Sequence, residues 1–159
     1  MIEPGTADLS QSLVLSSPRR TIDKMATEIS TEALLAMPED TIPGALKASL
    51  IVLAAPALQG YPRIDSYVDF DGEDGRFNMI KAIEDSVAWG GGSQALVQVA
   101  ATLWNGHETN LATALRNLDD GNLRRVLLAI EFRRGWRGFR QALMEAAEND
   151  QREAERHSK

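Results

Sequence analysis

The sequence of 159 residues contains no cysteine. It therefore cannot form a disulfide bond, offer a thiolate nucleophile or build a cysteine-based zinc or iron–sulfur site. Histidine is almost as scarce, because His107 and His157 are the only two. His107-Glu108 starts like the zinc-protease pattern HExxH, but Leu111 stands where the second histidine is required. We expect no metal, no cofactor and no catalytic activity, and the lack of cysteine favours a cytoplasmic location.

Long hydrophobic runs are also missing. The longest, at 48–58, is too short to span a bilayer and is interrupted by Pro56. The first 20 residues carry an acidic residue before their short apolar patch and basic residues after it, which is the reverse of a secretory signal. The sequence therefore predicts a protein without a membrane partner.

Positive charge is the third scarcity. The 17 Lys and Arg residues are outnumbered by 23 Asp and Glu residues, so the net charge is −6. This excess of acid disfavours a protein that coats nucleic acid, because phosphate binding needs clustered Lys and Arg. One segment departs from the average: residues 121–140 carry a net charge of +5. This basic segment is the clearest charge signal for binding.

Apolar residues recur at spacings of three and four over most of the chain, as is typical of amphipathic helices. We predict a mainly α fold: a compact helical bundle of about six helices, with at most a small β element near residues 63–70. The expected organisation is a loose N-terminal arm at 1–19, a single helical domain at 20–150 and a polar C-terminal tail at 151–159. Helical pieces, some of them short, are expected at 20–30, 30–38, 41–58, 76–89, 93–105, 109–118, 122–134 and from about 136.

Residues 86–107 contain no Asp, Glu, Lys or Arg and include three consecutive glycines at 90–92. A phosphate-binding loop would need a strand before the glycines and a lysine after them, but a helical pattern precedes them and Gln94 follows. We interpret the glycines as an elbow between two helices. The second helix, with Ser93 as its N-cap, is apolar over most of its circumference and is expected at the centre of the core. An enzyme or nucleotide binder that uses this elbow is the least favoured alternative.

Four acidic residues lie close together in the segment 69–75. Their spacing does not fit a calcium-binding EF-hand loop, so we predict a solvated turn that precedes a helix rather than a metal site. The turn is also a candidate contact for a protein partner. The residues are Asp69, Asp71, Glu73 and Asp74.

The basic segment has two interpretations as a binding site, beside a structural one in which its arginines pair only with acidic segments of the same protein. Two short helical patterns separated by a turn with Gly121 have the proportions of a helix-turn-helix, in which Asn122, Arg124 and Arg125 would reach bases or phosphates. Alternatively, arginines interleaved with aromatic side chains form a protein-binding surface, because arginine stacks on aromatic rings and makes paired hydrogen bonds. The residues expected on that surface are Arg133, Arg134, Trp136, Arg137, Phe139 and Arg140.

We favour the second interpretation. The sequence predicts a non-catalytic module that binds another protein, alone or within a nucleoprotein complex, as an accessory subunit, regulator or inhibitor. A helix-turn-helix regulator that binds DNA is the alternative. The sequence does not distinguish among the roles of the first kind, and it does not indicate an oligomeric state.

Overall fold

The helical periodicity of the sequence is realised in a computed structural model that describes residues 28–59 and 64–159. The expected mainly α bundle with a very small sheet is confirmed. The arm expected at 1–19 and most of the helix expected at 20–30 lie outside the described residues.

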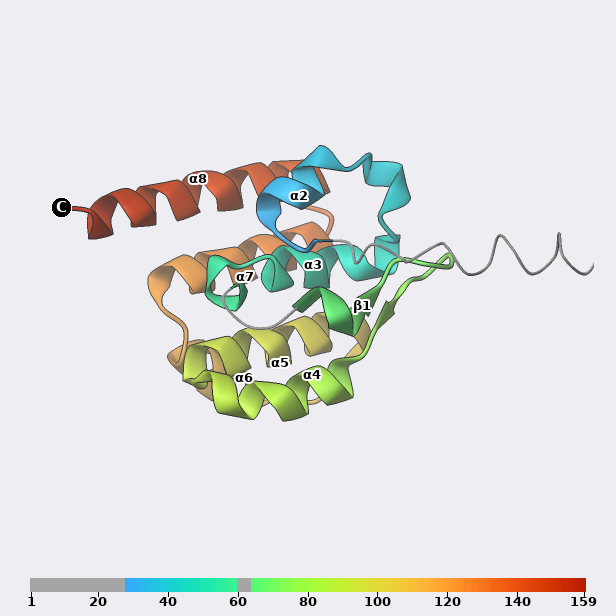
Figure 1. Cartoon of the computed structure of the whole chain (residues 1–159), viewed down its shortest axis with the longest axis horizontal. Helices are drawn as coiled ribbons and strands as arrows, with labels where there is room; N and C mark the ends of the chain where they lie inside the picture. The colour runs from blue at the N-terminus through green and yellow to red at the C-terminus, as the bar shows by residue number, and fades with distance from the viewer. Residues whose placement is uncertain (1–27, 60–63) are drawn as a thin grey trace, which may run out of the picture.

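Seven α-helices and two strands form the regular part of the described chain (Figure 1). The helices are α2 (Thr31–Ala36), α3 (Lys47–Leu53), α4 (Met79–Ser86), α5 (Gly91–Asn105), α6 (Leu111–Arg116), α7 (Asp120–Arg133) and α8 (Phe139–His157). Short 3-10 helices lie at Glu39–Thr41, Gly44–Leu46, Pro56–Leu58, Ile64–Tyr67 and Val87–Trp89, and the strands are β1 (Val68–Asp69) and β2 (Arg76–Phe77).

The helices are arranged in three layers. Figure 1 shows α8 and α2 along one side, α3 and α7 in the middle, and α4, α5 and α6 along the other side. The contacts agree with this view: α3 touches α5, α7 and α8, and α5 touches α4 and α6. The basic segment, which comprises α7 and the start of α8, therefore spans the middle layer and one outer layer.

The core is centred on α3 and α5. Six of the seven residues of α3 are buried, and α5 buries seven side chains on more than one face. The hydroxyl of Ser49 donates a hydrogen bond of 2.7 Å to the carbonyl of Ala100, which satisfies the one buried polar side chain of α3 against α5. Burial of α5 is as the sequence predicts, although Leu103 near its end is only half-buried.

The elbow at 90–92 differs from the prediction in one position. Gly90 has a φ of 96° and acts as the N-cap, so α5 begins at Gly91, and Ser93 lies buried in the first turn instead of capping it. Because a φ in this range is strained for any residue with a Cβ, a glycine is needed at position 90. Ala or another residue is sterically compatible at Gly91, where an added Cβ would meet Asn117 at ordinary contact distance, 3.7 Å.

The single helix predicted over 41–58 is wrong. The chain forms two 3-10 turns before α3 begins at Lys47, and another 3-10 turn starts at Pro56 after α3 ends at Leu53. Proline has no backbone N–H and fixes its own φ, so Pro43 and Pro56 delimit the helix.

The strand-like segment near 63–70 is extended only at its end. Ile64 and Tyr67 are buried three residues apart, which matches the period of the 3-10 helix that they form. Strand β1 then pairs antiparallel with β2, with Val68 opposite Phe77 and Asp69 opposite Arg76. Because residues 76 and 77 belong to this hairpin, the next helix starts at Met79, with the side chain of Asn78 as its N-cap, and not at 76 as expected.

The last helix is long. Gly138 is its N-cap, so α8 starts at Phe139 and not near Trp136, and residues 151–157 of the expected polar tail continue the helix. In Figure 1 the C-terminal part of α8 extends beyond the neighbouring helices. Over the described ranges, no helix combines the length and the hydrophobicity that a membrane span requires.

Candidate functional site

The basic segment is built around α7, whose two ends are well defined. The carboxylate of Asp119 accepts a hydrogen bond of 2.8 Å from the amide of Asn122 and so caps the first turn. At the other end Gly135 has a φ of 78°. Its amide donates a hydrogen bond to the backbone carbonyl of Phe132, and the amide of Trp136 donates one to the backbone carbonyl of Glu131. These two bonds form a Schellman motif, which fixes the direction of the chain at Trp136.

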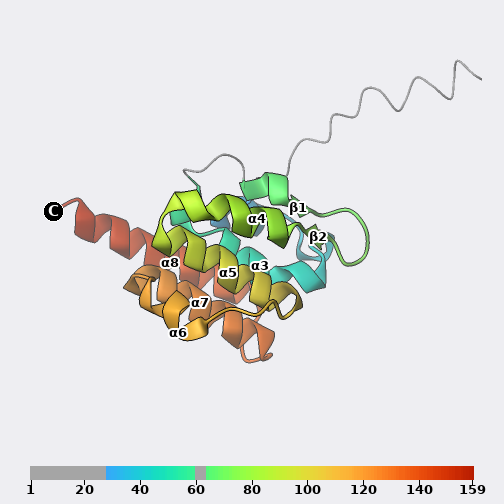
Figure 2. The same cartoon turned by 90° about the horizontal axis from the view of Figure 1, so that it is seen from below.

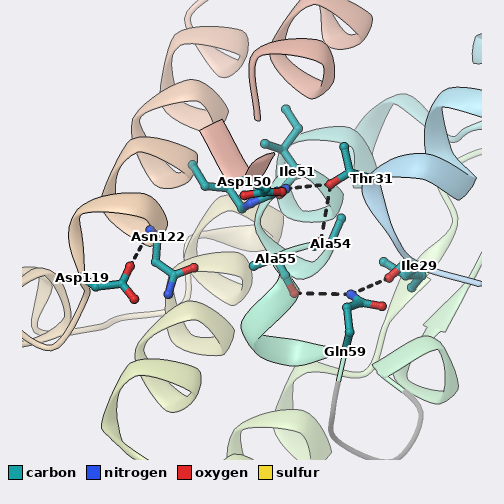
Figure 3. Close-up of polar contacts among 10 residues, drawn as sticks. Ile29, Thr31, Ile51, Ala54, Ala55, Gln59, Asp119, Asn122 and Asp150 are labelled. Carbon is teal, nitrogen blue, oxygen red and sulfur yellow. Dashed lines mark hydrogen bonds and ion pairs between the residues drawn. The ribbon is translucent and has the colours of Figure 1, made fainter. Parts of the chain in front are cut away.

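Arg125 is not on the surface, so the prediction that it contacts DNA is wrong. Its side chain is 2 % exposed and donates to the hydroxyl of Thr31 at 3.1 Å and to the carbonyl of Ile51 at 2.9 Å. Its other terminal nitrogen pairs with Asp150 of α8. Figure 3 shows Thr31, Ile51 and Asp150 grouped around this position. One guanidinium therefore ties together α2, α3, α7 and α8.

Burial dominates the electrostatics of this pair. Loss of water lowers the pKa of Arg125, and the attraction of Asp150 only partly opposes that effect. Loss of water likewise raises the pKa of Asp150, with Arg125 opposing it. Both shifts mean that the charged forms are costly to bury, so each charge depends on its partner and on the polar groups of Thr31 and Ile51.

Three other residues predicted on the protein-binding surface have structural contacts. Phe139 is 2 % exposed and packs edge-to-face on Phe132, with ring centroids 5.8 Å apart, so its assignment to the surface is wrong. Arg137 forms ion pairs with Glu131, at 2.6 Å, and with Glu145. The hydrogen bond to Glu131 is the main reason that the pKa of Arg137 is raised, and the two carboxylates together outweigh its positive charge.

Arg140 also contacts the protein itself. It donates to the carbonyls of Leu35, at 3.0 Å, and Met37, at 3.5 Å. These carbonyls lie at the C-terminal end of α2, where a helix has unpaired acceptors and a partial negative charge. Arg140 therefore caps α2, although its side chain remains exposed.

The remaining predicted residues lie where α7 ends. Trp136 is 72 % exposed, and the guanidinium carbon of Arg134 lies 5.3 Å from the centroid of its ring. This distance is within the range of a cation–π contact. Arg133 is exposed and donates to the carbonyl of Leu103, near the end of α5. Trp136 and Arg134 are thus the pair that the structure leaves open to solvent.

Two apolar residues of α7 are exposed as well. Leu127 is 49 % exposed and Ile130 is 36 % exposed, whereas the buried face consists of Arg125, Val126, Leu128 and Ala129. The helix has apolar residues on both sides, so periodicity alone does not decide which side faces inward. We call Arg124, Leu127, Ile130, Arg134 and Trp136 the α7 outer face.

A groove runs beside the α7 outer face, between α7 and α8. It has a volume of about 220 Å³ and is lined by Arg124, Leu127, Leu128, Glu131, Glu145 and Asn149. Since Glu131 and Glu145 both pair with Arg137, the ion pairs link the two walls of the groove.

The acidic turn lies elsewhere on the molecule. Asp69 accepts a hydrogen bond of 2.9 Å from the amide of Asp71, and Glu73 and Asp74 are exposed in the loop between β1 and β2. This loop and the turn between α7 and α8 lie apart in Figures 1 and 2, so the two predicted contact regions do not form one patch. Across residues 28–59 and 64–159, no group of three or more His, Asp or Glu side chains is arranged to hold a metal ion.

The proportions of a helix-turn-helix are present, but its surroundings are acidic. Helices α6 and α7 are separated by three residues, 117–119. The start of α7 borders a cavity of about 290 Å³ lined by Asp119, Asn122, Asp150, Glu153 and other residues of α8 and the Pro56 turn. These carboxylates would repel phosphate at the helix end that a recognition helix presents to DNA.

Comparison of the chain with protein-family models, with curated proteins and with solved structures found no match. The sequence identified Arg134 and Trp136 but missed Leu127 and Ile130, and it misplaced Arg125 and Phe139. The buried Arg125 could not be recognised locally, because its partner Asp150 is 25 residues away.

Proposed function

We propose that the chain is a non-catalytic protein-binding module, an accessory subunit, regulator or inhibitor of a larger protein or nucleoprotein complex, which acts in the cytoplasm. Its contact surface is the α7 outer face. The observation that carries the proposal is the exposed Trp136 with the guanidinium of Arg134 over its ring. Trp and Arg are the residue types most enriched where binding energy concentrates in protein interfaces.

The energy available at this surface is large enough to support binding. An aromatic side chain that loses about 150 Å² of exposed area gains about 4 kcal/mol, at about 25 cal/mol per Å². Leu127 and Ile130 add apolar area on the same side of the helix. Isolated exposed apolar residues are common on protein surfaces, but here an exposed Leu and Ile on α7 are followed by an exposed Trp in the turn at the end of the same helix.

Contacts within the chain hold this surface in the absence of a partner. The Schellman motif holds the backbone at Trp136, and the contact with Arg134 restrains the ring. A restrained side chain loses less conformational entropy on binding, so more of the gross energy remains as affinity. This favours a recognition role over a purely structural one.

The test compares two variants of the full chain as bait for partners. Trp136→Ala removes the central contact, and Val87→Ala changes a comparably exposed apolar residue, 67 % exposed, in the 3-10 helix Val87–Trp89 that follows α4. We expect a stoichiometric partner to co-purify with the wild-type chain and with Val87→Ala, and to be lost with Trp136→Ala. Equal retention of the partner by all three proteins would contradict the proposed surface, provided that circular dichroism shows all three folded.

The alternative, a helix-turn-helix regulator that binds DNA, retains Asn122 and Arg124 as candidate contacts. The connection of three residues between α6 and α7 supports it, and the acidic cavity at the start of α7 weakens it. Binding to duplex DNA that weakens steeply with salt and is lost in Arg124→Ala would favour this alternative over the protein-binding module.

A further inference from the structure

The α7 outer face has a regular geometry. Leu127, Ile130 and Arg134 are three and four residues apart, so they lie along one side of the helix. Arg124 borders this side one turn before Leu127. The distance from Arg124 to Arg134 along the helix axis is about 15 Å, because the rise is about 1.5 Å per residue. The face is therefore an apolar centre with a guanidinium at each end.

The two guanidiniums have no carboxylate partner among the described residues, since no ion pair within the described ranges includes Arg124 or Arg134. Glu131 and Glu145, which line the groove beside this face, share the single guanidinium of Arg137, so one negative charge of this cluster stays unbalanced. Asp120 lies one turn before Arg124 and limits the positive region to the part from Arg124 onwards. In a chain of net charge −6, this face presents positive charge to a partner.

The groove between α7 and α8 supplies a place for an apolar side chain. Its floor is Leu128, which is 7 % exposed, and Leu127 forms part of its rim. A partner residue seated there would lie beside Arg124 at one part of the groove and beside the Glu131 and Glu145 that share Arg137 at another. Apolar insertion and pairing with a guanidinium are thus available within one helical turn.

We infer that the α7 outer face binds an acidic amphipathic helix of the partner protein, which lies along α7 with leucine-like residues over Leu127 and Ile130 and carboxylates near Arg124 and Arg134. This inference rests on the proposed function, because it uses the same surface. A helix fits because its apolar residues at i, i+3 or i+4, and i+7 match the length of the stripe. Acidic residues fit because they neutralise both guanidiniums, and the planar group of arginine binds carboxylates through paired hydrogen bonds.

A second copy of this chain is a poorer occupant of the same face. Two α7 outer faces brought together would place Arg124 and Arg134 against like charges, which costs free energy. Duplex DNA is a poorer occupant as well, because Leu127 and Ile130 would be buried against phosphate and the acidic cavity lies at the start of the same helix. The experiment distinguishes a second copy and duplex DNA from an acidic helix.

The experiment measures binding of three labelled helical peptides of about 18 residues, which is long enough to cover three turns of α7. All three carry Leu at i, i+3 and i+7. The positions that flank this stripe are Glu in the first peptide, Lys in the second and Gln in the third. They are held helical by lactam bridges. Binding to the full chain is followed by fluorescence anisotropy, for the wild type, for Arg124→Glu/Arg134→Glu, and for the control Arg116→Glu/Arg152→Glu. The control changes the net charge equally at exposed arginines of α6 and α8.

We expect the Glu peptide to bind the wild type at least about tenfold more tightly than the Lys and Gln peptides, and to weaken as salt rises from about 50 mM to about 300 mM. Arg124→Glu/Arg134→Glu should reverse the preference towards the Lys peptide, and the control should keep the preference for Glu. The inference is overturned by three results: no preference for Glu, a preference that persists in Arg124→Glu/Arg134→Glu, or a dimer or a duplex DNA complex that this variant dissociates.

The two proposals fail in different ways. If Trp136→Ala loses the co-purifying partner but no peptide preference is found, the α7 outer face binds a protein and the partner segment is not an acidic helix. If Trp136→Ala keeps the partner, the proposed function fails at its own test, whatever the peptides do.

Discussion

The buried guanidinium of Arg125 is the residue on which the junction of four helices depends. Its donors are divided among Thr31, Ile51 and Asp150, so each of these groups is satisfied only when the helices that carry them are docked. The pKa shifts of both charged partners show that burial is unfavourable to the charges themselves. Removal of one partner should therefore lower the free energy of unfolding by more than the intact pair adds to it.

Asp150→Ala should lower the free energy of unfolding by about 3 kcal/mol, because it leaves the guanidinium of Arg125 buried without a carboxylate. The double variant Arg125→Met/Asp150→Leu should recover most of that loss, since it removes both charges and fills similar volume. Urea denaturation monitored by circular dichroism measures both. Glu148→Ala, at an exposed position of the same helix, is the control, and an equal effect of the two single variants would contradict the role assigned to Asp150.

Tyr67 gives the protein a dependence of stability on alkaline pH. Its hydroxyl donates to Asp85 at 2.6 Å, and burial, followed by the effects of Asp85, raises its pKa from 10.0 to about 12. Because the folded-state pKa is the higher one, the stabilisation is fully present below pH 10 and is lost as the pH rises from 10 to about 12. Tyr67→Phe should remove this part of the pH dependence and cost about 1 kcal/mol at neutral pH.

The measurement is the free energy of unfolding of wild type and Tyr67→Phe at several pH values from neutral to alkaline. The difference between the two proteins isolates Tyr67 from other groups that titrate in this range. A difference that stays constant as the pH rises from 10 to 12 would show that the phenol is not held neutral by its surroundings.

At the scale of elements, the start of α5 depends on one backbone conformation. Gly90 has a φ of 96° and a ψ of 158°, a region that residues with a Cβ avoid, and an added Cβ would meet nothing within 4 Å. Gly90→Ala should therefore cost about 1 to 3 kcal/mol through backbone strain alone. Gly91→Ala, inside the first turn, should be neutral or stabilise by up to about 1 kcal/mol.

Thermal or urea unfolding of the two glycine variants tests this difference, because each adds a single methyl group and the positions are adjacent. Equal effects would mean that the turn relaxes around position 90. The prediction also identifies which glycine of the run at 90–92 is required, a question that the sequence alone leaves open.

The sequence identifies helices best where a capping residue and a single apolar stripe coincide. The helices expected over 30–38 and 109–118 begin at Thr31 and Leu111, directly after the caps Ser30 and Asn110. Prediction fails where a helix is apolar on two sides, as in α7, because the face that is buried is then chosen by the neighbouring helices. It also fails at 41–58, where two prolines divide a continuous apolar pattern.

At the scale of the whole molecule, the C-terminal part of α8 contributes unequally to stability. Residues 155–159 are exposed, whereas Asp150 pairs with Arg125 in the interior and Glu153 lies against Gly121. Deletion of 155–159 should change the free energy of unfolding by at most about 0.5 kcal/mol, as exposed positions usually do. Deletion of 150–159 should cost about 3 kcal/mol or more, because it also removes the carboxylate.

Urea denaturation of the two truncated chains checks this prediction. A large loss on deletion of 155–159 alone would mean that the exposed end of α8 stabilises the fold through its charges, such as Arg156, which pairs with Glu153 on the same helix. Addition of salt would then reduce that loss, because exposed ion pairs are screened.

The sequence predicts the overall charge pattern, but it predicts the candidate surface only in part. Composition identified the basic segment, since six of its 20 residues are arginines, against seven in the other 139 residues. Which of those arginines face solvent depends on contacts across the sequence: Arg125 with Asp150, Arg137 with Glu145 and Arg140 with Leu35. Such contacts arise only from the packing of α2, α7 and α8 and leave no local pattern.

The four-helix junction at Arg125 has a consequence for synthesis on the ribosome, which proceeds from the N-terminus. Thr31 and Ile51 are made before Arg125, but the carboxylate that balances it is added 25 residues later. A nascent chain that ends between these positions can assemble α3, α5 and α7 only by enclosing an unbalanced positive charge. We expect the tight packing of this interior to be delayed until Asp150 has emerged, so that folding during translation is a late, concerted event.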